Sequence, residues 1–120
     1  MERYHLSGSE YRFLQVVWEA EPVGSGQLVE LCREKLEWKK STTYTVLKKL
    51  CEKGILSNES STVRSAVPRE AVDHHAAEGF VERTFGGSLP GFLAAFMGGR
   101  KLTETEAEDL KRLIDQYKEG

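Results

Sequence analysis

Cysteine, proline and long apolar runs are all scarce in this sequence of 120 residues. Its two cysteines, Cys32 and Cys51, are too few for a disulfide framework, so a reduced, cytoplasmic protein is expected. The longest uninterrupted apolar run covers residues 92–97, far short of the roughly 20 residues that cross a bilayer. We therefore expect no membrane insertion. The first residues include an acid and no apolar segment, which predicts that there is no secretory signal.

Net charge is also low, because 17 basic and 19 acidic side chains leave a formal charge of −2. With 39% hydrophobic residues, such a chain is expected to fold around a core. The charge is uneven, since residues 33–53 hold seven bases and only three acids. A local basic patch on a nearly neutral body suits a selective nucleic-acid binder, although an ordinary solvated helix face can have the same composition.

The first half of the chain is predicted to hold three helices and a hairpin. The first helix begins at a capping box formed by Ser7 and Glu10 and stops before Pro22. Two more helices span about residues 24–38 and 41–53, and a short hairpin follows within residues 55–67. This order of elements is that of a winged helix-turn-helix, so residues 1–68 are predicted to form a winged-helix DNA-binding domain.

The second half, residues 69–120, is predicted to be helical throughout and to form a dimerisation domain. The fold class is thus mostly α, with the α+β character of a winged helix. Segments of about 50 residues have marginal cores, and a second copy is the simplest cover for their apolar side chains. We therefore expect a homodimer through these positions: Phe80, Phe85, Leu89, Phe92, Leu93, Phe96, Leu110, Leu113 and Ile114.

The outward side of the predicted third helix carries short hydroxyls, one aromatic ring and two lysines: Ser41, Thr42, Tyr44, Thr45, Lys48 and Lys49. Hydroxyl groups can hydrogen-bond base edges and lysines neutralise phosphates, so this face suits the major groove of DNA. The same residue types also occupy ordinary helix surfaces.

Several segments, taken in order, resemble the penicillinase-repressor family of the BlaI, MecI and CopY type: residues 6–10, 17–19, 38, 42–56, 85–88, 93–96 and 101–106. The resemblance implies a homodimeric winged-helix transcriptional repressor that binds a palindromic operator in double-stranded DNA. It assigns the DNA contacts to the outward face of the third helix. The wing lacks the family's usual Gly-Arg and Tyr-x-Tyr, which leaves Arg64 as its candidate contact.

In the penicillinase branch, a membrane sensor-protease triggers cleavage of the repressor within its dimerisation helices. By position, the corresponding bond here joins Ala95 to Phe96, and the resemblance implies such a protease as a partner. The same two residues are equally expected as plain dimer core. The copper-sensing branch has Cys-x-Cys pairs near its C-terminus, and their absence here argues against copper sensing through thiolates.

Other functions have weaker support in the residues. His74 and Glu78 share a helix face beside His75, but two ligands without a third do not predict a metal site, so no metal and no cofactor are expected. No catalytic spacing motif is present, which predicts that the chain is not an enzyme. The alternatives left open are a winged-helix protein-interaction module and a DNA-binding sensor of a ligand or metal.

Overall fold

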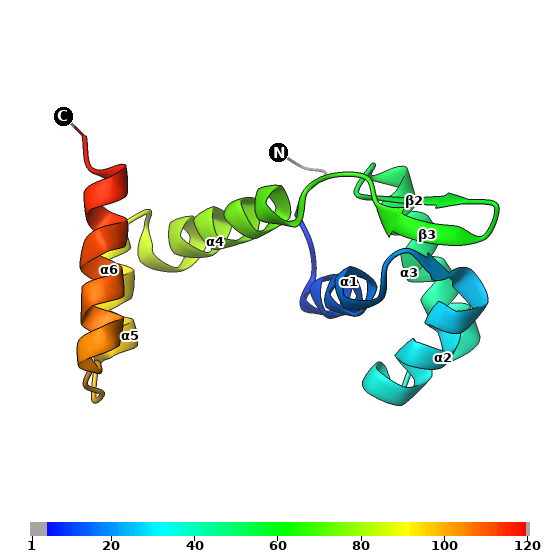
Figure 1. Ribbon diagram of the computed structural model, residues 1–120, viewed down its shortest axis with the longest axis horizontal. Coiled ribbons are helices and arrows are strands. Elements are labelled where there is room, and N and C mark those ends of the chain that lie inside the picture. The colour runs from blue at the N-terminus through cyan, green and yellow to red at the C-terminus, as the bar shows by residue number, and fades with distance from the viewer. Residues whose placement is uncertain (1–4, 120) are drawn as a thin grey trace. The chain divides into compact units, whose positions relative to one another are not determined.

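A computed structural model describes residues 5–119, which form six helices and one three-stranded sheet (Figure 1). By its internal contacts the chain separates into two compact units, one ending at Phe80 and the other beginning at Val81. This division falls inside helix α4 (Arg69–Phe85). The predicted functional boundary after Pro68 stays a prediction.

Helix α1 (Gly8–Ala20) begins at the predicted capping box. The Ser7 hydroxyl accepts a hydrogen bond from the Glu10 amide at 3.1 Å, and the Glu10 carboxylate accepts one from the Ser7 amide at 2.8 Å. Both bonds satisfy amides that the helix itself leaves unpaired. The apolar positions of the helix recur at helical spacing, which puts Phe13, Leu14 and Val17 fully inside the core.

Helices α2 (Ser25–Leu36) and α3 (Lys40–Glu52) are joined by a short turn. Glu37 closes α2 in the left-handed conformation, with φ of 58°. Trp38 then stacks on Phe13 of α1, with ring centroids 5.7 Å apart and planes 9° from parallel. This stacking fixes where α3 begins, and Gly54, with φ of +80°, allows the chain to leave its other end.

The sheet has the order β1-β3-β2 and is antiparallel throughout. Its strands are β1 (Val23–Gly24), β2 (Leu56–Glu59) and β3 (Thr62–Ser65), and Val63 pairs with Val23 on one side and Asn58 on the other. Ser60 and Ser61 both have positive φ, as a tight two-residue hairpin turn requires. Three helices followed by this wing confirm the predicted winged-helix fold class.

The first unit has a continuous apolar core drawn from α1, α2, α3 and the sheet. The start of α4 completes it, because Val72 is fully buried in the same cluster. The Tyr11 hydroxyl of α1 donates a hydrogen bond to Asp73, and the Arg69 guanidinium lies over the Trp18 ring, 4.7 Å from its centre. These contacts attach the beginning of α4 to α1.

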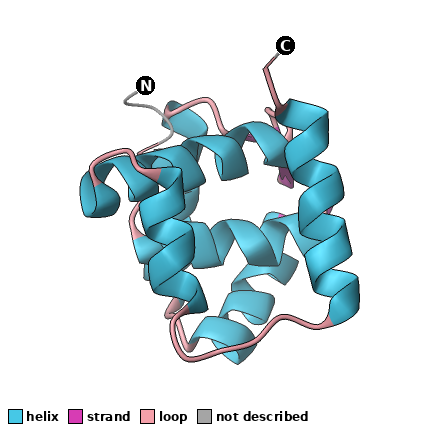
Figure 2. Cartoon of the chain, turned by 90° about the vertical axis from the view of Figure 1, so that its left-hand side faces the viewer, coloured by secondary structure: helices cyan, strands magenta, loops and turns pink. Residues whose placement is uncertain are grey.

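The second unit contains the end of α4 with α5 (Leu89–Met97) and α6 (Glu104–Tyr117). Ser88 caps α5 through the Gly91 amide at 2.9 Å, and Thr103 and Glu106 form a capping box at the start of α6. Figure 2 shows α5 and α6 running in opposite directions. No side chain of these two helices is buried within the single chain.

Candidate nucleic-acid interface

Helix α3 has a sharply divided surface. Thr43, Leu47 and Leu50 are buried against the core. The six positions predicted to contact DNA are all exposed: Ser41, Thr42, Tyr44, Thr45, Lys48 and Lys49. The structure therefore brings the predicted residues together on one solvent-facing side of one helix.

Two lysines at the start of α3 extend this face and were missed by the sequence prediction. Lys39 is the N-cap residue, makes no side-chain capping bond, and is exposed together with Lys40. Their position at the very beginning of the helix was the available signal, since backbone and side-chain groups there commonly contact phosphates. From Lys39 to Cys51 the helix carries four lysines and no acid.

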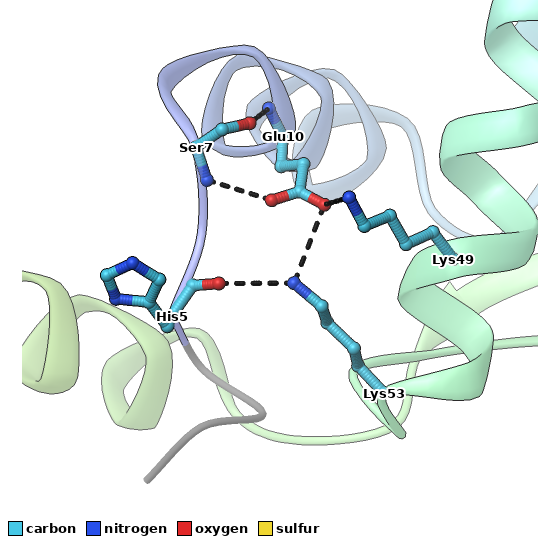
Figure 3. Close-up of polar contacts among 5 residues, drawn as sticks. All are labelled: His5, Ser7, Glu10, Lys49 and Lys53. Atoms are coloured by element: carbon cyan, nitrogen blue, oxygen red, sulfur yellow. Dashed lines mark hydrogen bonds and ion pairs between the residues drawn. The ribbon is translucent and has the colours of Figure 1, made fainter.

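A buried carboxylate lies beneath the other end of α3 (Figure 3). Glu10 is 5% exposed, and its Oε2 lies 3.5 Å from the ammonium nitrogens of both Lys49 and Lys53. Lys53 also donates a hydrogen bond to the His5 carbonyl at 3.1 Å. Burial raises the pKa of Glu10, but the Ser7 amide and the two ammonium groups more than offset it and hold that pKa below its usual value. We call Glu10, Lys49 and Lys53 the Glu10 cluster.

The wing presents little positive charge. Arg64 is exposed on β3 and is the only base between residues 54 and 68, while Glu59 lies at the end of β2 next to the turn. The base of the wing is fixed by Glu21, whose carboxylate accepts hydrogen bonds from the amide and hydroxyl of Ser65 at 2.7 and 2.9 Å. These two bonds hold the base of the wing in place. Arg64 is then the one basic side chain of the wing that could contact DNA.

The predicted dimerisation residues, all but Phe80 in the second unit, expose much apolar surface. Among the predicted dimerisation residues, five are exposed and four are half-buried: Phe80, Leu89, Phe96, Leu113 and Ile114 in the first set, Phe85, Phe92, Leu93 and Leu110 in the second. A cavity of about 620 Å³ opens between α5 and α6, lined by Phe92, Phe96 and Leu110 among others. Such a surface is typical of a chain that associates with a partner.

Comparison with known proteins identifies the family. The family model described as penicillinase repressor matches residues 6–116, nearly the whole chain. The chain belongs to the penicillinase-repressor family. The family consists of DNA-binding transcriptional regulators and not of enzymes, which agrees with the exposed, basic face of α3.

A curated relative extends the comparison without adding a function. The chain is 27% identical over 113 residues to the "Uncharacterized 16.5 kDa protein in ptsI 3'region" of Latilactobacillus sakei. The match covers 91% of this chain and 77% of that protein. That name states no activity.

The bond that would correspond to the family's cleavage position lies near the C-terminal end of α5. Ala95 and Phe96 are both exposed in the single chain, and the Phe96 ring stacks on Phe92 with centroids 5.8 Å apart. The Arg100 guanidinium covers the Phe96 ring at 4.6 Å from its centre. Phe96 thus lines the cavity between α5 and α6 as well as forming part of this bond.

The residues behind the sensor alternative are not brought together. His74 and Glu78 form an exposed pair on α4 with Nε2 and Oε2 3.6 Å apart, and residues 5–119 contain no cluster of three potential metal ligands. Burial raises the pKa of both thiols, Cys32 and Cys51, which favours their unreactive protonated form. Over the same described range, no helix is long and apolar enough to cross a membrane.

Proposed function

We propose that this chain is a homodimeric repressor that recognises a palindromic operator by placing α3 in the major groove of DNA. In this proposal Ser41, Thr42, Tyr44 and Thr45 face the base edges. Lysines of α3, Lys48 foremost, supply positive charge toward the phosphates. Lys49 contributes less because its ammonium group faces Glu10, and Arg64 adds one contact from the wing.

The observation that carries this proposal is the composition of the exposed side of α3. A helix in the major groove needs hydrogen-bonding side chains near its N-terminus and cations around them, and α3 has both without an intervening acid. A protein-interaction module would instead present an apolar patch there. Tyr44, 37% exposed, is the one large ring on this face.

The proposal is tested by titrating the protein into a labelled duplex taken from upstream of its own gene, with a shuffled duplex as competitor. The titration is run at two salt concentrations, and light scattering on the complex gives the number of protein chains per duplex. We expect tight, competitor-resistant binding by two chains per palindrome, with a salt slope set by the phosphate contacts. Equal affinity for the shuffled duplex would contradict the proposal.

Release by proteolysis belongs to the same proposal. A cut between Ala95 and Phe96 would divide α5 and remove one wall of the apolar cavity, so the dimer would lose much of its contact surface. A chain that ends at Ala95 imitates the cleaved product. We expect it to be monomeric in light scattering and to release the operator duplex, whereas a chain that ends after Tyr117 should behave as the full-length protein does.

A further inference from the structure

The Glu10 cluster contains a carboxylate that nothing in the proposed base readout uses. The Glu10 side chain is 7% exposed, and its Oε1 is satisfied by the Ser7 amide. Among residues 5–119 its Oε2 has no hydrogen-bond partner, and it faces two ammonium groups, each 3.5 Å away. A buried charge is costly unless it is paired, so the Ser7 amide and these two lysines together allow Glu10 to stay ionised beneath α3.

Both lysines come from the same end of α3. Lys49 lies in its last turn and Lys53 is its C-cap residue, and Lys53 also reaches the His5 carbonyl ahead of α1 (Figure 3). The residues proposed to read bases lie toward the opposite, N-terminal end. The cluster therefore fixes the C-terminal end of α3 to α1 and sets the direction in which its N-terminal end projects.

Lys48 and Lys49 are neighbours on α3 but differ in their ion pairs. It is exposed and makes no ion pair with any described residue, whereas the neighbouring Lys49 has its ammonium group facing the Glu10 carboxylate. A lysine that is already paired with a carboxylate must give up that pair before it can neutralise a phosphate, so it displaces fewer of the cations condensed on the DNA. The two adjacent lysines should thus contribute unequally to the salt dependence of DNA binding.

We infer that Glu10 is a positioning residue for α3, and that it holds Lys49 and Lys53 in competition with DNA phosphates. Glu10 in this way reduces the attraction of these lysines to DNA of any sequence. It also keeps the N-terminal end of α3, which is proposed to read bases, in a fixed position. The inference rests on the proposed function and adds a determinant of selectivity that lies outside the DNA-facing surface.

The first test replaces Glu10 by Gln, which keeps the shape and the acceptor for the Ser7 amide but removes the charge. We expect the preference for operator over shuffled duplex to fall about tenfold, the ratio that corresponds to one charged contact. We also expect the salt slope to become steeper by about one unit, because Lys49 is freed. If Glu10 made only a structural contact, the variant would bind both duplexes equally more weakly, and the salt slope of binding would not change.

The matched control is Glu19→Gln, which makes the same charge change at an exposed position of the same helix. Glu19 has only a distant pair with Lys35, at 3.9 Å. An operator preference that is unchanged in Glu10→Gln overturns the inference. So does a slope no steeper than that of the control.

A second pair of variants tests the lysines directly. Lys48→Met should flatten the salt slope by about one unit, and Lys49→Met should change it much less. Lys49→Arg should keep the operator preference of the natural protein, because an arginine can still pair with Glu10. Equal flattening by the two methionine variants would show that Lys49 acts as an ordinary phosphate contact and would overturn the inference.

A measurement without DNA separates this inference from the proposed function. The melting of the free protein is compared for Glu10→Gln, Lys49→Met and the double variant, and we expect the double variant to lose less stability than the two single losses combined. Additive losses overturn the inference whatever the DNA data show. If the losses are coupled but the natural protein prefers no duplex, the proposed function fails and the pairing of Glu10 with Lys49 stands.

Discussion

Thr45 lies in the middle of the exposed side of α3, one turn beyond Ser41. Its hydroxyl and methyl groups can both touch a base edge in the major groove. Thr45→Ala is expected to lower the ratio of operator to shuffled-duplex affinity roughly tenfold, within the range of a single lost base contact. Competitive titration measures the ratio, and Thr84→Ala, at an exposed threonine of α4, is the control. An equal loss of affinity for the operator and for the shuffled duplex would show that Thr45 does not read a base.

Glu10 also predicts how stability depends on pH. Its pKa in the folded protein lies below the usual 4.5, so the folded state favours the ionised form. This contribution is fully present above about pH 4.5 and is lost as the pH falls through the lowered value. Denaturant unfolding from pH 7 downward should show a loss of stability in the natural protein that is smaller in Glu10→Gln. Parallel curves for the two proteins would contradict the pairing.

At the scale of elements, Tyr11 is one of the residues that attach the beginning of α4 to α1. Burial and the neighbouring Asp73 carboxylate raise the pKa of Tyr11 to about 12. The protonated hydroxyl is therefore favoured by folding, and its contribution is complete below about pH 10 and is lost as the pH rises toward 12. Tyr11→Phe should lower the free energy of unfolding at pH 7 by about 1–2 kcal/mol and remove this alkaline loss.

The control for this variant is Tyr117→Phe, because Tyr117 is 80% exposed at the end of α6. Asp73 keeps its pair with Arg69 at 3.4 Å in both proteins, so no carboxylate is left without a partner. Urea unfolding at pH 7 and at pH 11 gives the comparison. If Tyr11→Phe and Tyr117→Phe unfold alike, the hydrogen bond to Asp73 does not hold α4 in place.

The elements that the sequence predicted are those whose signals are local. The capping box of α1 joins two residues only three positions apart, and the start of that helix was expected from it. Strand β1 was missed because its two residues, Val23 and Gly24, form a strand only by pairing with β3 some 40 residues away. The end of α2 was placed near Trp38, but Glu37 takes the left-handed conformation and ends the helix earlier.

The candidate site shows the same division. The exposed face of α3 followed from helical periodicity alone, so its six residues could be named from the sequence. The role of Glu10 could not, because its capping partner Ser7 is local while Lys49 and Lys53 lie about 40 residues further along. Helical periodicity also predicted the same phosphate-contacting role for Lys48 and Lys49. Only the packing of α3 against α1 shows that Lys49 faces Glu10 and Lys48 does not.

At the scale of the whole molecule, DNA binding and association are proposed to be coupled. One winged helix offers few phosphate contacts, since α3 and its N-cap residue together carry four lysines and the wing one arginine. Two linked copies bind a palindrome much more tightly than one, because the second contact forms at a high effective concentration. The exposed apolar surface of α5 and α6 is therefore as important to the proposed repressor as the face of α3.

Ile114 is the residue on which this coupling is best tested. It is 58% exposed on the apolar side of α6, so a charge there costs little in a single chain but much in a dimer interface. Ile114→Glu is expected to be monomeric in light scattering and to bind the operator at least about 100-fold more weakly. Gln116→Glu adds the same charge at another exposed position of α6 and should remain dimeric. A dimeric Ile114→Glu with unchanged affinity would place the interface elsewhere on the chain, while a monomer with unchanged affinity would show that one winged helix is enough for operator binding.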